Sequence, residues 1–127
     1  MEKIKKLKNI LIREKLDGYL IPKNDEFFGE YIPDHNDRLN FITNFSGSYG
    51  FALILKNQNY LFVDGRYTLQ ANNQSGKLFK IITIPDKMPN DILKRKRLII
   101  GFDPKLFTRK SLSFFFGKVI TLKNLLL

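Results

Sequence analysis

Apolar residues near the start of the chain recur at intervals of three or four positions, as they do on one face of a helix. These residues are Ile4, Leu7, Ile10 and Leu11. Their spacing predicts an amphipathic helix over residues 2–16. Asp17 and Gly18 are expected to end this helix, and the apolar run at 19–22 predicts the first strand.

The rest of the chain alternates between strand and helix patterns. Apolar runs at 51–56 and 60–63 flank a short polar segment, Asn57-Gln58-Asn59, and this arrangement predicts two antiparallel strands joined as a hairpin. The other expected helices are at 37–44, 67–74, 90–96 and 108–116, and the other expected strands are at 78–84, 98–102 and 118–121. This alternation predicts an α/β fold with a mixed five- or six-stranded sheet and helices on both faces.

Length and composition are consistent with one domain over residues 1–127. No apolar run is long enough to predict a membrane span, and the basic first segment lacks the unbroken apolar stretch of an export signal. The chain has no cysteine, which excludes disulfides and thiolate metal sites. We therefore expect a cytoplasmic protein with no membrane partner.

The net charge of +10 raises the question of nucleic-acid binding, but the charge is unevenly distributed. Residues 87–127 carry 10 basic and 2 acidic groups, whereas residues 18–86 carry 6 and 7. Lysine outnumbers arginine 16 to 6, and no aromatic-interleaved basic motif accompanies the positive charge. A general enrichment in lysine explains the charge more simply than a nucleic-acid partner does.

The candidate chemistry lies in Asp64-Gly65-Arg66-Tyr67, directly after an expected buried strand. Strand exits are where α/β proteins place ligand contacts, and an arginine there offers a planar fork suited to a carboxylate or a peptide carbonyl. Asp64 could hold that fork in place. A second interpretation is that Asp64 caps the following helix and Arg66 is a solvated surface charge.

Three segments lie in a fixed order along the chain: E-Y-I-P at 30–33, F-S-G-S-Y-G at 45–50 and F-V-D-G-R-Y-T-L-Q-A at 62–71. With D-G-Y-L-I-P at 17–22 and I-G-F-D-P at 100–104, they resemble the amino-terminal domain of the Xaa-Pro aminopeptidases, in the creatinase/prolidase-like family. The resemblance covers nearly the whole chain. Phe62 stands where the family usually has tryptophan, and Tyr49 stands where a small residue is usual.

The resemblance implies a noncatalytic domain that walls a substrate cleft, contributes Arg66 as a peptide contact and supports oligomerisation. Asp64 and Tyr67 are expected to support Arg66. Phe45 and Tyr49 could form an apolar lip beside it, although Phe45 also fits the core. In such an enzyme, metal-activated hydroxide in a separate carboxy-terminal domain removes the residue that precedes proline. The resemblance places a dinuclear metal site, with manganese as the expected ion, in that catalytic domain, which is absent from this sequence.

We expect no metal site or cofactor in this chain and no peptidase activity from it alone. His35 is its single histidine, and the nearby acidic groups Glu30, Asp34 and Asp37 are too close in sequence to supply the converging ligands of a dinuclear site. Residues 47–50 lack the lysine of a phosphate-binding loop and precede a strand, so they predict a tight turn.

Two alternatives remain open. The chain could be a free-standing assembly or binding module, or the remnant of a longer gene, or, less favoured, a basic nucleic-acid-binding protein. Three consecutive phenylalanines at 114–116 cannot all face one side of a helix, and the last three residues are leucines. Both features suggest contact with a catalytic domain or with a second subunit.

Overall fold

The elements of the fold follow the alternation of apolar and polar segments along the chain. The computed structural model describes residues 2–23, 38–47, 49–84, 86–93, 98–102 and 121–124. The helices are α1 (Glu2–Arg13), α2 (Arg38–Thr43), α3 (Thr68–Ser75) and α4 (Pro89–Leu93), with a short 3-10 helix, η2, at Gly65–Tyr67. The strands are β1 (Gly18–Pro22), β2 (Phe51–Leu55), β3 (Asn59–Asp64), β4 (Lys80–Ile84), β5 (Ile99–Phe102) and β6 (Thr121–Asn124).

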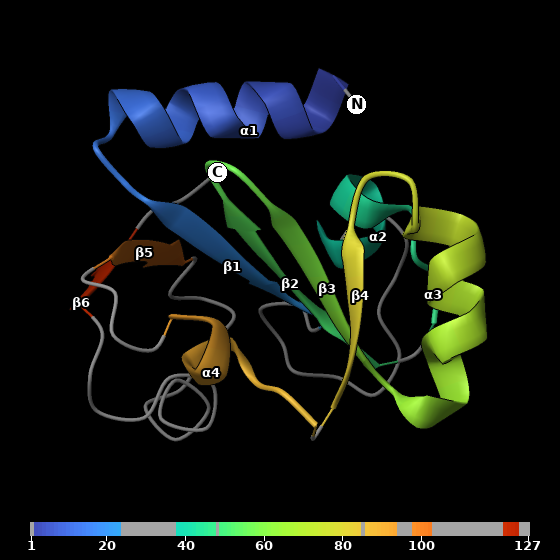
Figure 1. The fold of residues 1–127 in the computed structure, drawn as a ribbon. Coiled ribbons are helices and arrows are strands. Elements are labelled where there is room, and N and C mark those ends of the chain that lie inside the picture. Colours follow the sequence, from blue (N-terminus) through green and yellow to red (C-terminus); the bar gives the residue numbers. More distant parts are fainter. Residues whose placement is uncertain are drawn as a thin grey trace.

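The six strands form one mixed sheet in the order β4-β3-β2-β1-β5-β6 (Figure 1). The hairpin strands β2 and β3 pair antiparallel, as do β1 and β2, and the other neighbouring pairs are parallel. Chain order and sheet order differ because β5 returns to pair with β1 rather than with β4. This topology places β3 next to the edge strand β4.

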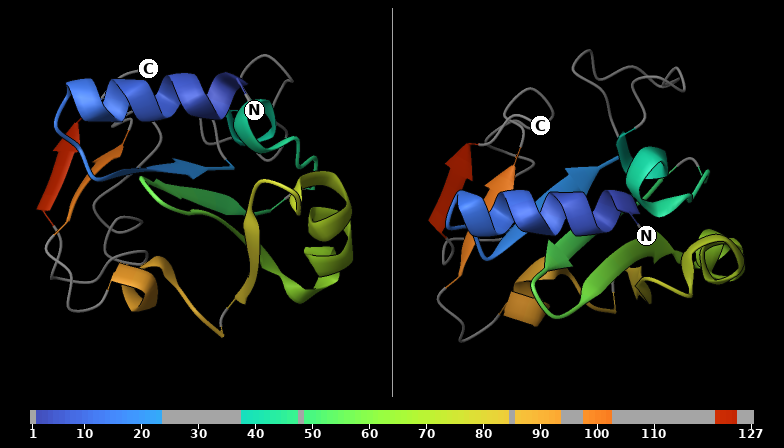
Figure 2. Two further views of the ribbon diagram at one scale, coloured as in Figure 1. Left: turned by 45° about the horizontal axis from the view of Figure 1, so that its top comes forward. Right: turned by 90° about the horizontal axis from the view of Figure 1, so that it is seen from above.

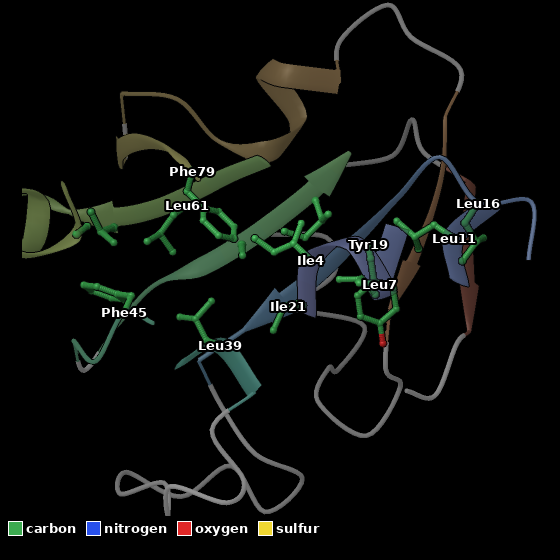
Figure 3. Close-up of a cluster of buried hydrophobic side chains, with 14 residues drawn as sticks. Ile4, Leu7, Leu11, Leu16, Tyr19, Ile21, Leu39, Phe45, Leu61 and Phe79 are labelled. Carbon is green, nitrogen blue, oxygen red and sulfur yellow. The ribbon is translucent and has the colours of Figure 1, made fainter. Parts of the chain in front are cut away.

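Helical segments cover both faces of the sheet, as Figures 1 and 2 show. On one face, α1 and α3 contribute to a core that includes Leu7, Leu11 and Ala71 (Figure 3). On the other face, Met88 and Ile92 from the α4 segment pack against a second core. Every residue of β1 and β2 is buried because both strands are covered from both sides. Coverage on both sides explains why these strands are apolar throughout rather than alternating.

The expected fold class is confirmed, with differences at element ends. The first helix ends at Arg13, earlier than predicted, because Lys15 adopts a left-handed φ of 58°. The amide of Leu16 donates to the carbonyl of Leu11 at 2.8 Å, and the amide of Lys15 donates to that of Ile12 at 3.1 Å. These two bonds satisfy the last carbonyls of the helix without the predicted glycine.

Other boundaries shift by one to three residues. The helix predicted from residue 67 begins at 68, because η2 occupies the turn before it. The last strand is described at Thr121–Asn124, later than the predicted 118–121. The helix expected near 108–116, with its three phenylalanines, and the final three leucines lie outside the described residues. So does the charged segment that contains His35.

Candidate functional site

The corner after β3 is formed by Asp64, the last residue of that strand. Its backbone is extended, with φ −80° and ψ 167°, and its carboxylate Oδ1 accepts a hydrogen bond from the amide of Arg66 at 2.9 Å. This capping bond satisfies one of the free amides at the start of η2. The buried strand therefore ends in a rigid turn that presents Arg66 to solvent.

The same carboxylate holds the Arg66 side chain at two points. Arg66 Nε donates to Asp64 Oδ1 at 3.3 Å, and Nη2 donates to Oδ2 at 2.8 Å. The hydrogen bonds from Arg66 hold the pKa of Asp64 below its usual range, and Asp64 in turn raises the pKa of Arg66. The Arg66 side chain is nevertheless 77% exposed, so its remaining donors are accessible from solvent. Capping by Asp64 and orientation of Arg66 thus occur together.

Tyr67 and Phe45 support this corner from below. The guanidinium carbon of Arg66 lies 5.3 Å from the centre of the Tyr67 ring, within the range of a cation–π contact. The rings of Tyr67 and Phe45 meet edge to face with their centroids 6.1 Å apart. Phe45 is fully buried, so it belongs to the core and forms no exposed lip. A continuous stack of side chains therefore connects the core to Arg66.

Tyr49 is the exposed aromatic residue of the glycine loop, and its side chain meets Phe51 edge to face at 6.5 Å. Partial burial raises the pKa of the Tyr49 phenol, and the negative charge of Asp64 raises it further. The electrostatic effect of Asp64 on Tyr49 places the loop and the corner in one local environment. The structure thus groups Tyr49 with Asp64 and Arg66 at the surface.

The glycines of the loop are required for packing. A Cβ atom at Gly47 would lie 2.2 Å from Cζ of Phe45, and one at Gly50 would lie 3.0 Å from the carbonyl oxygen of Phe62 and 3.2 Å from Phe45. Only glycine allows the loop to cross the Phe45 ring at this distance. The G-x-x-G spacing therefore reflects the position of Phe45.

Sequence reasoning missed a polar clamp, which we define as Ser46, Gln70 and Gln74. The amide of Ser46 donates to Gln74 Oε1 at 3.0 Å, and its hydroxyl accepts from Gln74 Nε2 at 2.9 Å and from Gln70 Nε2 at 3.1 Å. A buried bond reinforces the clamp, because Ser75 Oγ donates to the Thr43 carbonyl at 2.6 Å. The i, i+4 spacing of two glutamines on a predicted helix was the available signal, but their partner lies 24 and 28 residues away.

The described residues contain no group of three or more histidine, cysteine, aspartate or glutamate side chains that could hold a metal ion. In the same part of the chain, no helix combines the length and the apolar character needed to cross a membrane. Neither the loop nor the corner offers an obvious set of catalytic groups. The corner is suited to binding an anionic or carbonyl oxygen rather than to chemistry.

The fold and this corner define a mixed α/β domain whose exposed arginine is fixed at a strand exit. Residues 3–118 match the family described as the Creatinase/Prolidase N-terminal domain, and the chain belongs to that family. Among known proteins, it is 32% identical over 126 residues to an Xaa-Pro aminopeptidase of Caenorhabditis elegans. The match covers 85% of this chain and 20% of that enzyme. A probable Xaa-Pro aminopeptidase P of Laccaria bicolor is 36% identical over 87 residues, which are 67% of this chain and 14% of the relative.

Solved structures agree with this assignment. The X-prolyl aminopeptidase of Caenorhabditis elegans, described as a cytosolic enzyme with a di-nuclear active site, matches with a TM-score of 0.77 and 30% identity over 87% of this chain and 20% of that one. The N-terminal domain of the cytoplasmic peptidase PepQ from Mycobacterium tuberculosis shares the fold, with a TM-score of 0.72 and 22% identity over 98% of this chain and 92% of that one. The chain thus spans about a fifth or less of the length of the first curated relatives that it matches.

Proposed function

We propose that this chain is the noncatalytic N-terminal domain of a metal-dependent Xaa-Pro aminopeptidase. In this role it walls the substrate cleft and contributes Arg66 as a contact for the peptide. It also supports association of subunits. The cytoplasm is the proposed location, in line with the cytosolic relative from Caenorhabditis elegans.

The observation that carries this proposal is the state of Arg66. A guanidinium that is 77% exposed would ordinarily sample many rotamers, yet Asp64 fixes it at two points. Fixing a long side chain in advance reduces the entropy lost when a ligand binds. An exposed but oriented arginine, with donors left over, is suited to a carboxylate or a peptide carbonyl.

The hydrolytic chemistry is assigned to another domain. The described residues provide no set of metal ligands, whereas the relative from Caenorhabditis elegans is described with a di-nuclear active site. We propose that the metal ions, with manganese as the expected ion, belong to a catalytic domain joined to this one. The 127-residue chain should then bind no stoichiometric metal in elemental analysis after dialysis.

The test is a chimera in which this chain replaces the matching segment of the Caenorhabditis elegans enzyme. The chimera should hydrolyse Xaa-Pro peptides, and Arg66→Ala should reduce kcat/KM by roughly tenfold to a hundredfold, the effect of losing one charge-assisted contact. Arg13→Ala is the matched control, because Arg13 is also an exposed arginine beside an acidic partner, Glu14, but lies on α1. A folded chimera without activity, or equal losses in both variants, would contradict the proposal.

A further inference from the structure

The strand β4 forms one edge of the sheet within the described part of the chain. It pairs with β3 along its whole length, from Lys80 opposite Tyr60 to Ile84 opposite Asp64, and no other described strand lies on its far side. A strand at an edge carries a row of backbone amides and carbonyls that point away from its neighbour and can pair with another strand.

The sequence of β4 lacks most of the features that prevent such pairing. Four of its five residues are β-branched, and its single charge, Lys80, stands at the first position. Pro85 follows the strand rather than interrupting it. Native edge strands usually avoid pairing through central charges, prolines or bulges. The charge and the proline of β4 both lie at its ends and leave the centre open.

An exposed apolar side chain lies close to this edge. Leu69 is 76% exposed, the highest value among the large apolar residues described. It belongs to α3, which runs beside β4 in Figure 1. The preceding residue, Thr68, places its hydroxyl 3.1 Å from that of Thr83 on β4. A strand added to this edge would bring further apolar surface close to Leu69.

We propose that the β4 edge, together with Leu69, binds a second copy of this chain in a two-fold dimer. An antiparallel pairing centred on Ile82 would place Lys80 of each copy opposite Ile84 of the other, and Ile81 opposite Thr83. No like charges would then face each other, so the strand is compatible with its own copy. The pairing closes on itself, because the same surface is used by both copies.

The two helices α3 would lie on the same face of the joined sheet, on either side of the two-fold axis. Each Leu69 would then be partly covered by the partner, which removes exposed apolar area from water. This inference stands on the sheet edge alone and does not depend on the peptidase role of Arg66.

The first experiment is sedimentation of the 127-residue chain over a range of concentrations. We expect a reversible dimer whose dissociation constant rises several-fold in Leu69→Ser. Ile12→Ser is the matched control, because Ile12 is 62% exposed on α1 and should leave the dimer unchanged. A chain that stays monomeric at millimolar concentration would overturn the proposal, and so would a dimer that responds equally to both substitutions.

The second experiment tests the register. Ile84→Lys would place two lysines opposite each other at both ends of the pairing and should weaken the dimer by roughly tenfold, whereas Ile84→Glu would face Lys80 and should retain it. Combining Ile84→Lys with Lys80→Glu should restore dimerisation. Circular dichroism checks that these variants fold, and Leu69→Ser still decides the outcome if they do not. Equal weakening by lysine and glutamate at position 84 in folded protein would overturn the proposed pairing.

Discussion

The ring of Phe45 meets the ring of Tyr67 edge to face, with their centroids 6.1 Å apart. Phe45 is fully buried, whereas Tyr67 is half-buried and lies beneath the guanidinium of Arg66. The pair therefore transmits the position of the core to the surface corner. Substitutions around it should separate residues that hold the fold from residues that orient Arg66.

Removing Arg66 should change the titration of Asp64 but scarcely change the stability of the fold. Hydrogen bonds from Arg66 hold the pKa of Asp64 below its usual range, so the carboxylate stays charged until the pH falls below that range. Any stability that this pair contributes is present above the ordinary pKa and is lost as the pH falls through the lowered value. In Arg66→Ala, carboxyl resonances followed by NMR should show the Asp64 pKa moving up toward about 3.9. An unchanged pKa would contradict the role of the ion pair.

Tyr49 should titrate at a higher pH than an ordinary tyrosine, whose pKa is about 10. Burial raises its pKa first, and the charge of Asp64 adds to this shift. Since the folded state holds the proton more tightly, the stability linked to Tyr49 is present below the ordinary pKa and is lost as the pH rises through the raised value. Asp64→Asn should lower the Tyr49 pKa only in part, which NMR of labelled tyrosine can measure. A complete return to the ordinary value would show that burial has no effect.

Gly47→Ala should destabilise the fold by about 1–3 kcal/mol, the usual cost of forcing an extra carbon into a packed site. The new Cβ would lie 2.2 Å from Cζ of the buried Phe45 ring, which has little room to move. Gly65→Ala is the control, because a Cβ there has no atom within 4 Å. Urea denaturation measures both free energies of unfolding. Similar losses in the two variants would argue against the packing role of Gly47.

Gln74→Ala should loosen the glycine loop. It removes the acceptor for the Ser46 amide and a donor to the Ser46 hydroxyl, at a cost of about 1 kcal/mol. The Ser46 amide should then exchange faster with solvent. The adjacent Asn73 is exposed, and Asn73→Ala should leave both stability and exchange unchanged. If the Ser46 amide keeps its protection in Gln74→Ala, the polar clamp does not hold the loop.

Local patterns in the sequence determined the fold class and most of its elements. Period-four apolar spacing located α1, and continuous apolar runs located β2 and β3, because these features depend on neighbours within a few positions. They also located the corner, since Asp64 and Arg66 are two residues apart and pair directly. The end of α1 was misplaced, because the left-handed Lys15 leaves no mark in composition.

Only the tertiary structure decided how distant segments meet. It buried Phe45 beneath Tyr67, assigned Gly47 to packing rather than to a binding loop, and joined Ser46 to glutamines 24 and 28 residues away. It also placed β4 at the edge of the sheet, although nothing in its apolar sequence distinguishes an edge strand from a central one. Such relationships depend on strand order and on the crossing of helices over the sheet, and contacts between remote residues leave no periodic signal in a single chain.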